Sequence, residues 1–207
     1  MERIEYKNYM IEIEQDEFSD SPREWDNLGT MVCFHSRYNL GDKHSMSIEE
    51  AKEFSKRKDI FVLPLYLYDH SGLVMDTARF SCPWDSGQVG FIYVTKEAVK
   101  KEWKVAKISG TLKMRIESIL RAEVQTYSDY LGGNVYHYHV TNKDGEFCDS
   151  CGGFYGYDHE KSGLLEYAKG AIDADIENRK ELRQRTLKTL IKNNVPLDKR
   201  ENILSKN

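Results

Sequence analysis

Six side chains in this sequence are of types that bind metal ions, and most of them stand near the ends of segments that we predict to be strands. They are Cys33, His35, His70, Cys82, Asp85 and Cys151. Thiolate, imidazole and carboxylate groups are the ligands that proteins use for zinc. The same groups can act as acid, base or nucleophile. We therefore regard these six residues as candidate ligands of a zinc ion.

Two turns between strand-like segments hold the densest part of this set. Ile60–Tyr68 and Gln88–Val94 consist largely of β-branched and aromatic residues, which is typical of buried strands. Asp69–Gly72 and Pro83–Gly87 are rich in the residues that form turns. We expect thiol, imidazole and carboxylate groups from these turns to converge at one end of a sheet.

Other roles for the same residues stay open. Asp69 and Asp85 can accept hydrogen bonds from backbone N–H groups inside their turns, which is a purely local role. Cys82 with His70 can form a nucleophile–base pair, as can Cys33 with the histidine two positions later. The sequence contains no glycine-rich phosphate loop, no G-x-S-x-G segment and no H-E-x-x-H segment. The enzyme classes that depend on those patterns are therefore excluded.

Cys148 and Cys151 form a C-x-x-C pair with the spacing of a zinc-binding turn. A tetrahedral site needs two more ligands, and His137 and His139 can supply them because residues i and i+2 of a strand share one face. The alternative is two unconnected thiols. Disulfides are not expected, because we predict a cytoplasmic location for the chain.

Charge and hydropathy limit the classes of partner. The 207 residues carry a net charge of -4, and the pI is near 5.9. This balance argues against direct nucleic-acid binding, which needs a basic surface. No apolar run approaches the length of a membrane-spanning helix, and the first residues lack the pattern of a signal peptide. We therefore expect no membrane association.

The charges are unevenly distributed along the chain. Acidic residues crowd the beginning, and we predict that they bind a partner protein. They are Glu12, Glu14, Asp16, Glu17 and Asp20. Basic residues crowd the stretch from Arg179 to Arg200. For both regions, a simple solvated surface is the alternative.

Periodicity and capping signals predict an α+β fold, with an antiparallel or mixed sheet of hairpins and short flanking helices. Met10–Ile13 and Leu28–His35 read as strands, and Phe61–Tyr68 as the first arm of a hairpin. Ser47 with Glu50 forms a capping box ahead of a short helix.

The second half of the chain combines helices and hairpins. Thr95 caps a second helix, and a third is predicted from Thr111 to about Arg121. An alternating segment follows, then Gly132–Gly133, which together predict a hairpin. A long helix begins after Ser162 and ends before Pro196. We expect a sheet domain over residues 1–160 and a helical extension over residues 161–207.

Several long segments resemble a family of small proteins carried by bacteriophages and mobile elements. They are Ser21–Cys33, Leu63–Gly72, Phe80–Gly90, Tyr130–Tyr136 and Asp149–Gly156. The resemblance covers about residues 5–170. Cys151 belongs to the shared pattern, whereas position 148 does not regularly carry cysteine. The resemblance therefore favours the other candidate ligands over the C-x-x-C pair.

The resemblance implies an accessory phage protein, and some chains of this kind are similar to anti-CRISPR proteins that block a type II effector nuclease. We accordingly expect an inhibitor that binds a host CRISPR effector nuclease by occlusion, without catalysis and with a bound zinc ion. One alternative is a small metal-dependent hydrolase or nucleotide-handling enzyme that uses the His/Asp/Cys turn cluster. Another is a transcription-linked protein that contacts a polymerase through its basic C-terminal helix.

Overall fold

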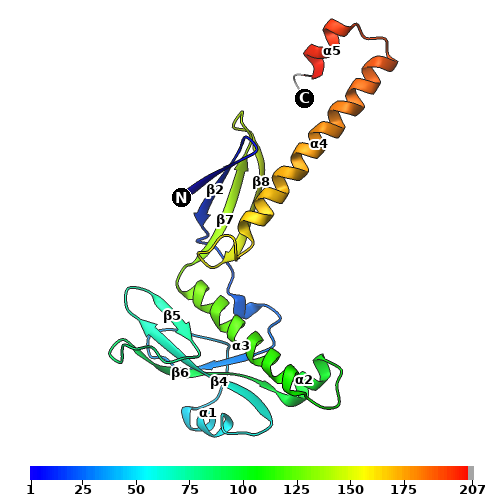
Figure 1. Ribbon diagram of the computed structural model, residues 1–207. Helices are drawn as coiled ribbons and strands as arrows, with labels where there is room; N and C mark the ends of the chain where they lie inside the picture. The colour runs from blue at the N-terminus through cyan, green and yellow to red at the C-terminus, as the bar shows by residue number, and fades with distance from the viewer. Residues whose placement is uncertain (205–207) are drawn as a thin grey trace. The chain divides into compact units, whose positions relative to one another are not determined.

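The computed structural model describes residues 1–204, except for the side chain of Asn202, and the fold is α+β as predicted (Figure 1). The chain forms two compact units. The first consists of Met1–Asp16 together with the chain from Tyr136 onward, and the second of Glu17–Val135. This division differs from the expected boundary at residue 160, because the N-terminal strands pair with a strand that follows residue 134.

The first unit is a four-stranded antiparallel sheet with a long helix on one face (Figure 1). Its strands are, in spatial order, β1 (Glu2–Tyr6), β2 (Tyr9–Gln15), β7 (Val135–Thr141) and β8 (Phe147–Tyr155). Ile11 and Ile13 of β2 are buried together with Tyr138 and Val140 of β7. The alternating residues of β2 therefore build the core, as the predicted strand required.

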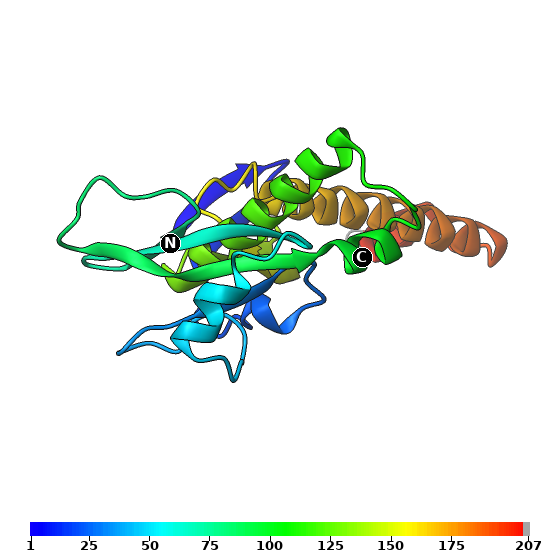
Figure 2. The ribbon, with the colours of Figure 1, turned by 90° about the horizontal axis from the view of Figure 1, so that it is seen from below.

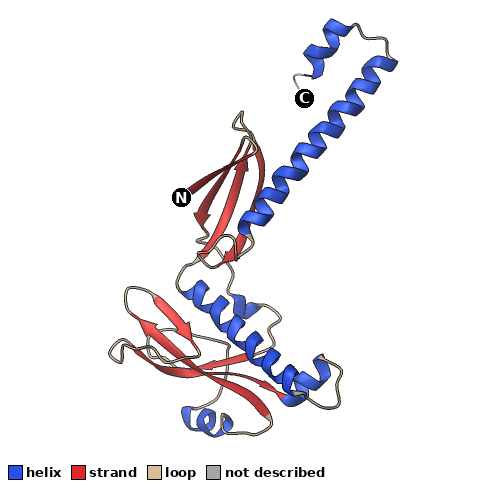
Figure 3. Cartoon of the chain, viewed as in Figure 1, coloured by secondary structure: helices blue, strands red, loops and turns tan. Residues whose placement is uncertain are grey.

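The helix on this sheet, α4 (Leu164–Lys192), is buried only in its first part. Its fully buried side chains are Leu164, Ala168 and Ile172. Figure 3 shows the helix continuing well past the sheet, toward the short helix α5 (Leu197–Leu204). The predicted long C-terminal helix is confirmed. Its N-cap is Gly163, with φ 82°, one residue after the predicted cap at Ser162.

The second unit is another four-stranded antiparallel sheet, with helices on both faces (Figures 1 and 2). Its strands are, in spatial order, β3 (Thr30–Cys33), β6 (Ser86–Thr95), β4 (Ile60–Asp69) and β5 (Leu73–Asp76). Its helices are the 3-10 turn η1 (Pro22–Glu24), α1 (Ile48–Phe54), α2 (Lys96–Glu102) and α3 (Gly110–Leu131).

The two helix caps and the first hairpin that the sequence predicts in this unit are present in the structure. Ser47 accepts a hydrogen bond from the Glu50 amide, and the Glu50 side chain accepts one from the Ser47 amide, so the capping box is confirmed. Thr95 caps α2 through a hydrogen bond from Ala98 N. β4 and β5 form the expected hairpin.

The hairpin predicted around Gly132–Gly133 is wrong, because α3 continues to Leu131. The residues that are buried in its last two turns include Val124, Tyr127 and Ser128, which have helical spacing. Two of them are polar, and the backbone satisfies them: Met75 N donates to Ser128 Oγ at 2.9 Å, and Gly41 N donates to Tyr127 Oη at 2.9 Å. These buried hydroxyls made the helical face look polar in the sequence.

The antiparallel pairing of the second sheet brings three strand ends together. β3 and β4 both run antiparallel to β6. The C-terminal ends of β3 and β4 therefore lie at the same end of the sheet as the start of β6. We call the segments at this end, residues 34–46, 69–72 and 77–85, the loop end.

Candidate functional site

The loop end contains a hollow of about 410 Å³. Its lining includes His35, Arg37, Asp69, Trp84 and Asp85. Two of the predicted ligands, His35 and Asp85, therefore line one surface, as expected of converging strand ends. A second hollow of about 850 Å³ lies beside residues 33–44.

A cluster of hydrogen-bonding groups surrounds the carboxylate of Asp85. Cys82 Sγ lies 3.4 Å from Asp85 Oδ2 and donates a hydrogen bond to it. His70 Nδ1 lies 3.5 Å from the same oxygen. Both predicted turn residues thus meet Asp85, although the imidazole is 64% exposed. A thiol, an imidazole and a carboxylate in this arrangement can exchange a proton with solvent or with a bound group.

Asp69 is held by a different set of partners. Arg37 forms an ion pair with its carboxylate, and Tyr38 Oη donates to Asp69 Oδ1 at 3.4 Å. The Asp69 amide donates to the backbone oxygen of Asp85 at 2.8 Å. The two turns are therefore joined through the backbone as well as through side chains. Sequence patterns missed Arg37, because a solvated loop arginine carries no periodic signal.

Cys33 and His35 are adjacent to this cluster but differ in environment. Cys33 belongs to the core, and burial, with a smaller contribution from Asp42, raises the pKa of its thiol to about 12. His35 stacks on Tyr38 with ring centroids 4.9 Å apart, and its Nδ1 accepts a hydrogen bond from Arg37 N.

Cys148 and Cys151 lie on the edge strand β8 of the first unit rather than in a turn. Residues three positions apart in a strand point to opposite faces. Cys148 packs against the core of the first unit, whereas Cys151 is exposed. Burial raises the pKa of the Cys148 thiol. The C-x-x-C spacing therefore does not form a zinc-binding turn here.

Within residues 1–204, no three His, Cys, Asp or Glu side chains are arranged to hold a metal ion. Around Asp85, the Cys82 thiol donates a hydrogen bond and the His70 imidazole lies 3.5 Å from the carboxylate. Zinc binding stays a prediction for the loop end.

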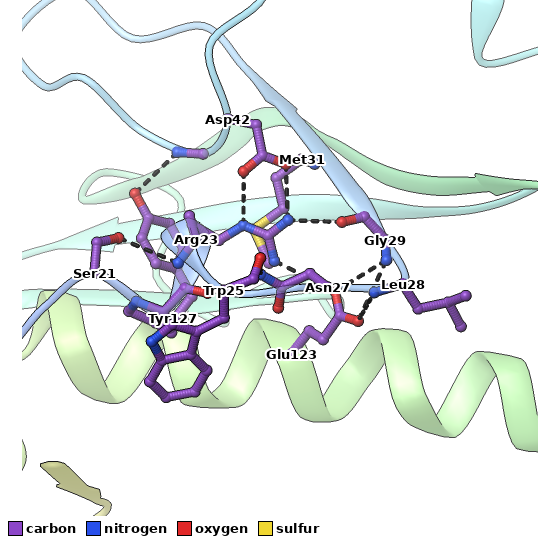
Figure 4. A network of polar contacts seen from close by, with 12 residues as sticks. Ser21, Arg23, Trp25, Asn27, Leu28, Gly29, Met31, Asp42, Glu123 and Tyr127 are labelled. Carbon is purple, nitrogen blue, oxygen red and sulfur yellow. Dashed lines mark hydrogen bonds and ion pairs between the residues drawn. The ribbon is translucent and has the colours of Figure 1, made fainter.

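The segment Ser21–Cys33 contains an arginine, Arg23, that is buried in a network of polar contacts (Figure 4). The side chain of Arg23 is only 6% exposed. It donates to both carboxylate oxygens of Asp42, at 2.9 and 2.7 Å, and to the backbone oxygen of Gly29 at 2.6 Å. Its third nitrogen lies 3.3 Å from Glu123 on α3.

The two carboxylates around Arg23 also bind backbone N–H groups. Asp42 accepts from Met31 N at 2.7 Å, and Glu123 accepts from Leu28 N at 2.8 Å (Figure 4). Burial is the largest influence on the pKa of Arg23 and lowers it, but the carboxylates more than compensate, so its pKa is raised. This network joins the start of β3 to α3, and it occupies all three nitrogens of the Arg23 guanidinium.

The predicted acidic partner-binding segment is divided between the two units. Glu12 forms an ion pair with Arg3 at 2.7 Å, and Glu14 lies 3.8 Å from His137. Asp16 accepts a hydrogen bond from the amide of Gly153 at 3.3 Å. The remaining two residues, Glu17 and Asp20, belong to the second unit and are exposed. Their arrangement as one partner-binding surface stays a prediction.

Trp84 is a residue at the loop end that is not among the predicted site residues. Its side chain is 92% exposed, although large aromatic residues are usually buried. It lies in the turn Pro83–Gly87, beside the hollow.

Among residues 1–204, no helix is both long and apolar enough to cross a membrane. Comparison of the chain with protein-family models, with curated proteins and with solved structures finds no match. The geometry of the loop end is therefore the basis for assigning a function.

Proposed function

We propose that this chain is a binding protein that inhibits a host nuclease by occlusion, and that its loop end makes the central contact. The observation that carries the proposal is the 92% exposure of Trp84 on a turn that is fixed to the sheet. Tryptophan is the side chain most enriched among residues that dominate binding energy at protein interfaces. An exposed tryptophan on a rigid support costs little entropy on binding.

The turn around Trp84 is held in place from several directions. The Asp69 amide bonds to Asp85 O at 2.8 Å, and the Ser86 hydroxyl donates to the backbone oxygen of Cys82. The Cys82 thiol in turn donates to the Asp85 carboxylate. These bonds tie the turn to the ends of β4 and β6. In this proposal the thiol and the carboxylate position the tryptophan, and no catalytic step is needed.

The nature of the partner follows from the resemblance to phage proteins. It favours a type II CRISPR effector nuclease of the host, as in anti-CRISPR proteins. The nucleic-acid channels of such a nuclease are basic, and exposed acidic residues such as Glu17 and Asp20 would accelerate association with them. This electrostatic contribution would weaken with added salt.

The test is a pull-down at low salt with a purified type II effector nuclease, together with a DNA-cleavage assay. We expect the intact chain to bind and inhibit, and Trp84→Ala to lose at least about tenfold in affinity, as is usual for a central aromatic contact. Tyr157→Ala is the matched control, because this residue is also exposed, at 77%, but lies in the first unit. Failure of the intact chain to bind at low salt would overturn the proposal.

A second candidate function, a small metal-dependent hydrolase or nucleotide-handling enzyme, is favoured by one observation. Cys82 Sγ and His70 Nδ1 both lie within 3.5 Å of the same Asp85 oxygen. Elemental analysis of the purified protein tests for bound zinc. Loss of a hydrolytic activity in both His70→Ala and Asp85→Asn, with an unchanged unfolding midpoint, would support the enzyme over the inhibitor.

A further inference from the structure

The strand β6 is longer than its neighbour β3, and this leaves part of its edge without a strand partner. β3 pairs only with Gly90–Tyr93 of β6. One further bond, from Phe34 N to Val89 O at 2.7 Å, continues the pairing. Within the described chain, no strand pairs with Ser86–Gln88 on that side, although β4 pairs with them on the other.

The space beside this edge is open. A Cβ atom added to Gly87, which would point away from one face of the sheet, would meet nothing within 4 Å, so that face is also uncovered here. Gly87 and Gln88 are exposed. The hollow of about 410 Å³ lies here, with residues 34–37 and 84–89 in its lining. We call it the edge slot.

The side chains of the edge slot offer both apolar and acidic contacts. Half-buried Phe34 contributes apolar surface, and the buried core residues Leu67 and Val89 lie beneath it in the lining. Trp84 stands at its margin, almost fully exposed. Asp85, whose side chain is 37% exposed, adds a carboxylate.

The second carboxylate in the lining, Asp69, is already paired. Arg37 forms an ion pair with it. Asp85 has only an imidazole and a thiol beside it. The charge left for a ligand is therefore negative, and it lies at Asp85.

We infer that the edge slot binds an extended segment of the partner protein by strand addition, with a basic side chain of that segment on Asp85. An unpaired strand edge supplies backbone donors and acceptors to a peptide, and neighbouring hollows select alternate side chains. The inference rests on the proposed function, since it names the kind of contact that the loop end makes with its partner.

The probe is a fluorescein-labelled peptide of alternating valine and lysine, six residues long, added to the full-length protein. An otherwise identical peptide of valine and glutamate tests the charge. We expect the lysine peptide to bind at least about tenfold more tightly than the glutamate peptide, because a lysine at the slot meets the carboxylate of Asp85 whereas a glutamate meets a like charge. Asp85→Asn should reduce this preference, whereas Asp144→Asn, at an exposed carboxylate of the first unit, should not.

Two N-methylated versions of the lysine peptide test the backbone. Amides at alternate positions of a strand point to the same side. Methylation of one alternate set should therefore weaken binding about tenfold or more, and methylation of the other set should not, since only one edge of the peptide pairs. The NMR signals of the Gly87 and Gln88 amides should shift when the unmethylated peptide is added.

Equal binding of both methylated peptides, or the absence of binding by every peptide, would overturn strand addition. The two proposals fail separately. If the nuclease binds in a Trp84-dependent manner but no peptide binds, strand addition is wrong and the inhibitor proposal stands. If the lysine peptide binds at the edge slot but the nuclease does not bind the protein, strand addition is supported and the partner is not this nuclease.

Discussion

Two arginine–aspartate pairs in the second unit differ in the exposure of the arginine and in the number of carboxylates beside it. The side chains of Arg23 and Asp42 are 6% and 22% exposed, and their network includes a second carboxylate. The side chains of Arg37 and Asp69 are 66% and 21% exposed. Both pairs join segments far apart in the sequence. The first arginine is buried and each of its three nitrogens has a partner, whereas the second lies on an open surface.

The difference separates residues that hold the fold from residues that are available for binding. A buried guanidinium must stay paired with carboxylates, because an unpaired charge in the interior is very costly. An exposed guanidinium is solvated and can exchange partners at little cost. Within the segments Ser21–Cys33 and Phe80–Gly90, the residues around Arg23 therefore maintain β3 and α3. Those around Trp84 and Asp85 remain available to a partner.

The largest effect is expected for Arg23→Ala, which leaves Asp42 and Glu123 without their shared counter-charge. Breaking one side of a buried ion pair costs about 3–5 kcal/mol, and we expect a loss of that size in urea unfolding. Arg37→Ala is the matched control and should cost less than about 1 kcal/mol. Similar losses in the two variants would contradict the distinction between the pairs.

Two glycines of β6 test the same contrast in the backbone. A Cβ at Gly90 would lie 1.9 Å from Val32 O, so Gly90→Ala must push β3 away. We expect a destabilisation of about 1–3 kcal/mol, typical of overpacking. Gly87→Ala should be nearly neutral in thermal unfolding, because nothing lies within 4 Å of the added atom. A marked loss of stability in Gly87→Ala would argue that the face of the sheet at Gly87 is covered by other parts of the chain.

Alkaline pH tests the buried thiol beside the Arg23 network. In the folded chain the pKa of Cys33 is raised from 9.0 to about 12. In the unfolded chain the thiol loses its proton near its ordinary pKa. Between these two values the unfolded state binds fewer protons, so stability must fall as pH rises through the window. Urea midpoints measured at about pH 8 and about pH 10.5 should show the fall.

The Cys33→Ala variant provides the comparison for this measurement. It should show a shallower decline over the same pH range. Part of the decline should persist, because burial and the hydrogen bond to Asp175 also raise the pKa of Tyr9 to about 12. An unchanged slope in Cys33→Ala would show that the thiol does not contribute.

The smallest effect on stability is expected for Trp84→Ala. An exposed side chain without core contacts usually changes the free energy of unfolding by no more than about 0.5 kcal/mol. Thermal unfolding of this variant should match the unaltered chain, although its partner affinity falls. A loss of stability above about 1 kcal/mol would mean that the tryptophan supports the turn and is not free to bind.

The sequence was informative where local rules decide the structure. Strand alternation identified β2, and the serine–glutamate spacing identified the start of α1. It failed at α3, where the alternation at Val124, Thr126 and Ser128 suggested a strand. There the tertiary environment decides, since Ser128 is buried against the backbone of Met75.

At the candidate site, the convergence of the strand ends was predictable, but the partners of each side chain were not. The turn signals placed His70 and Asp85 at neighbouring strand ends, and their side chains do approach. Nothing local distinguishes Arg23, a buried hub, from Arg37, a surface residue. Both are arginines beside turns, and only the packing of α3 and β3 removes one of them from water.

The order of segments in the first unit has a consequence for biosynthesis. A ribosome releases β1 and β2 first, yet β7, which pairs with β2, follows only after the whole of Glu17–Val135 has been made. The second unit can therefore fold while the hairpin of β1 and β2 is still without β7. During that interval the edge of β2 is unprotected, so a stall in translation near residue 135 exposes the nascent chain to aggregation.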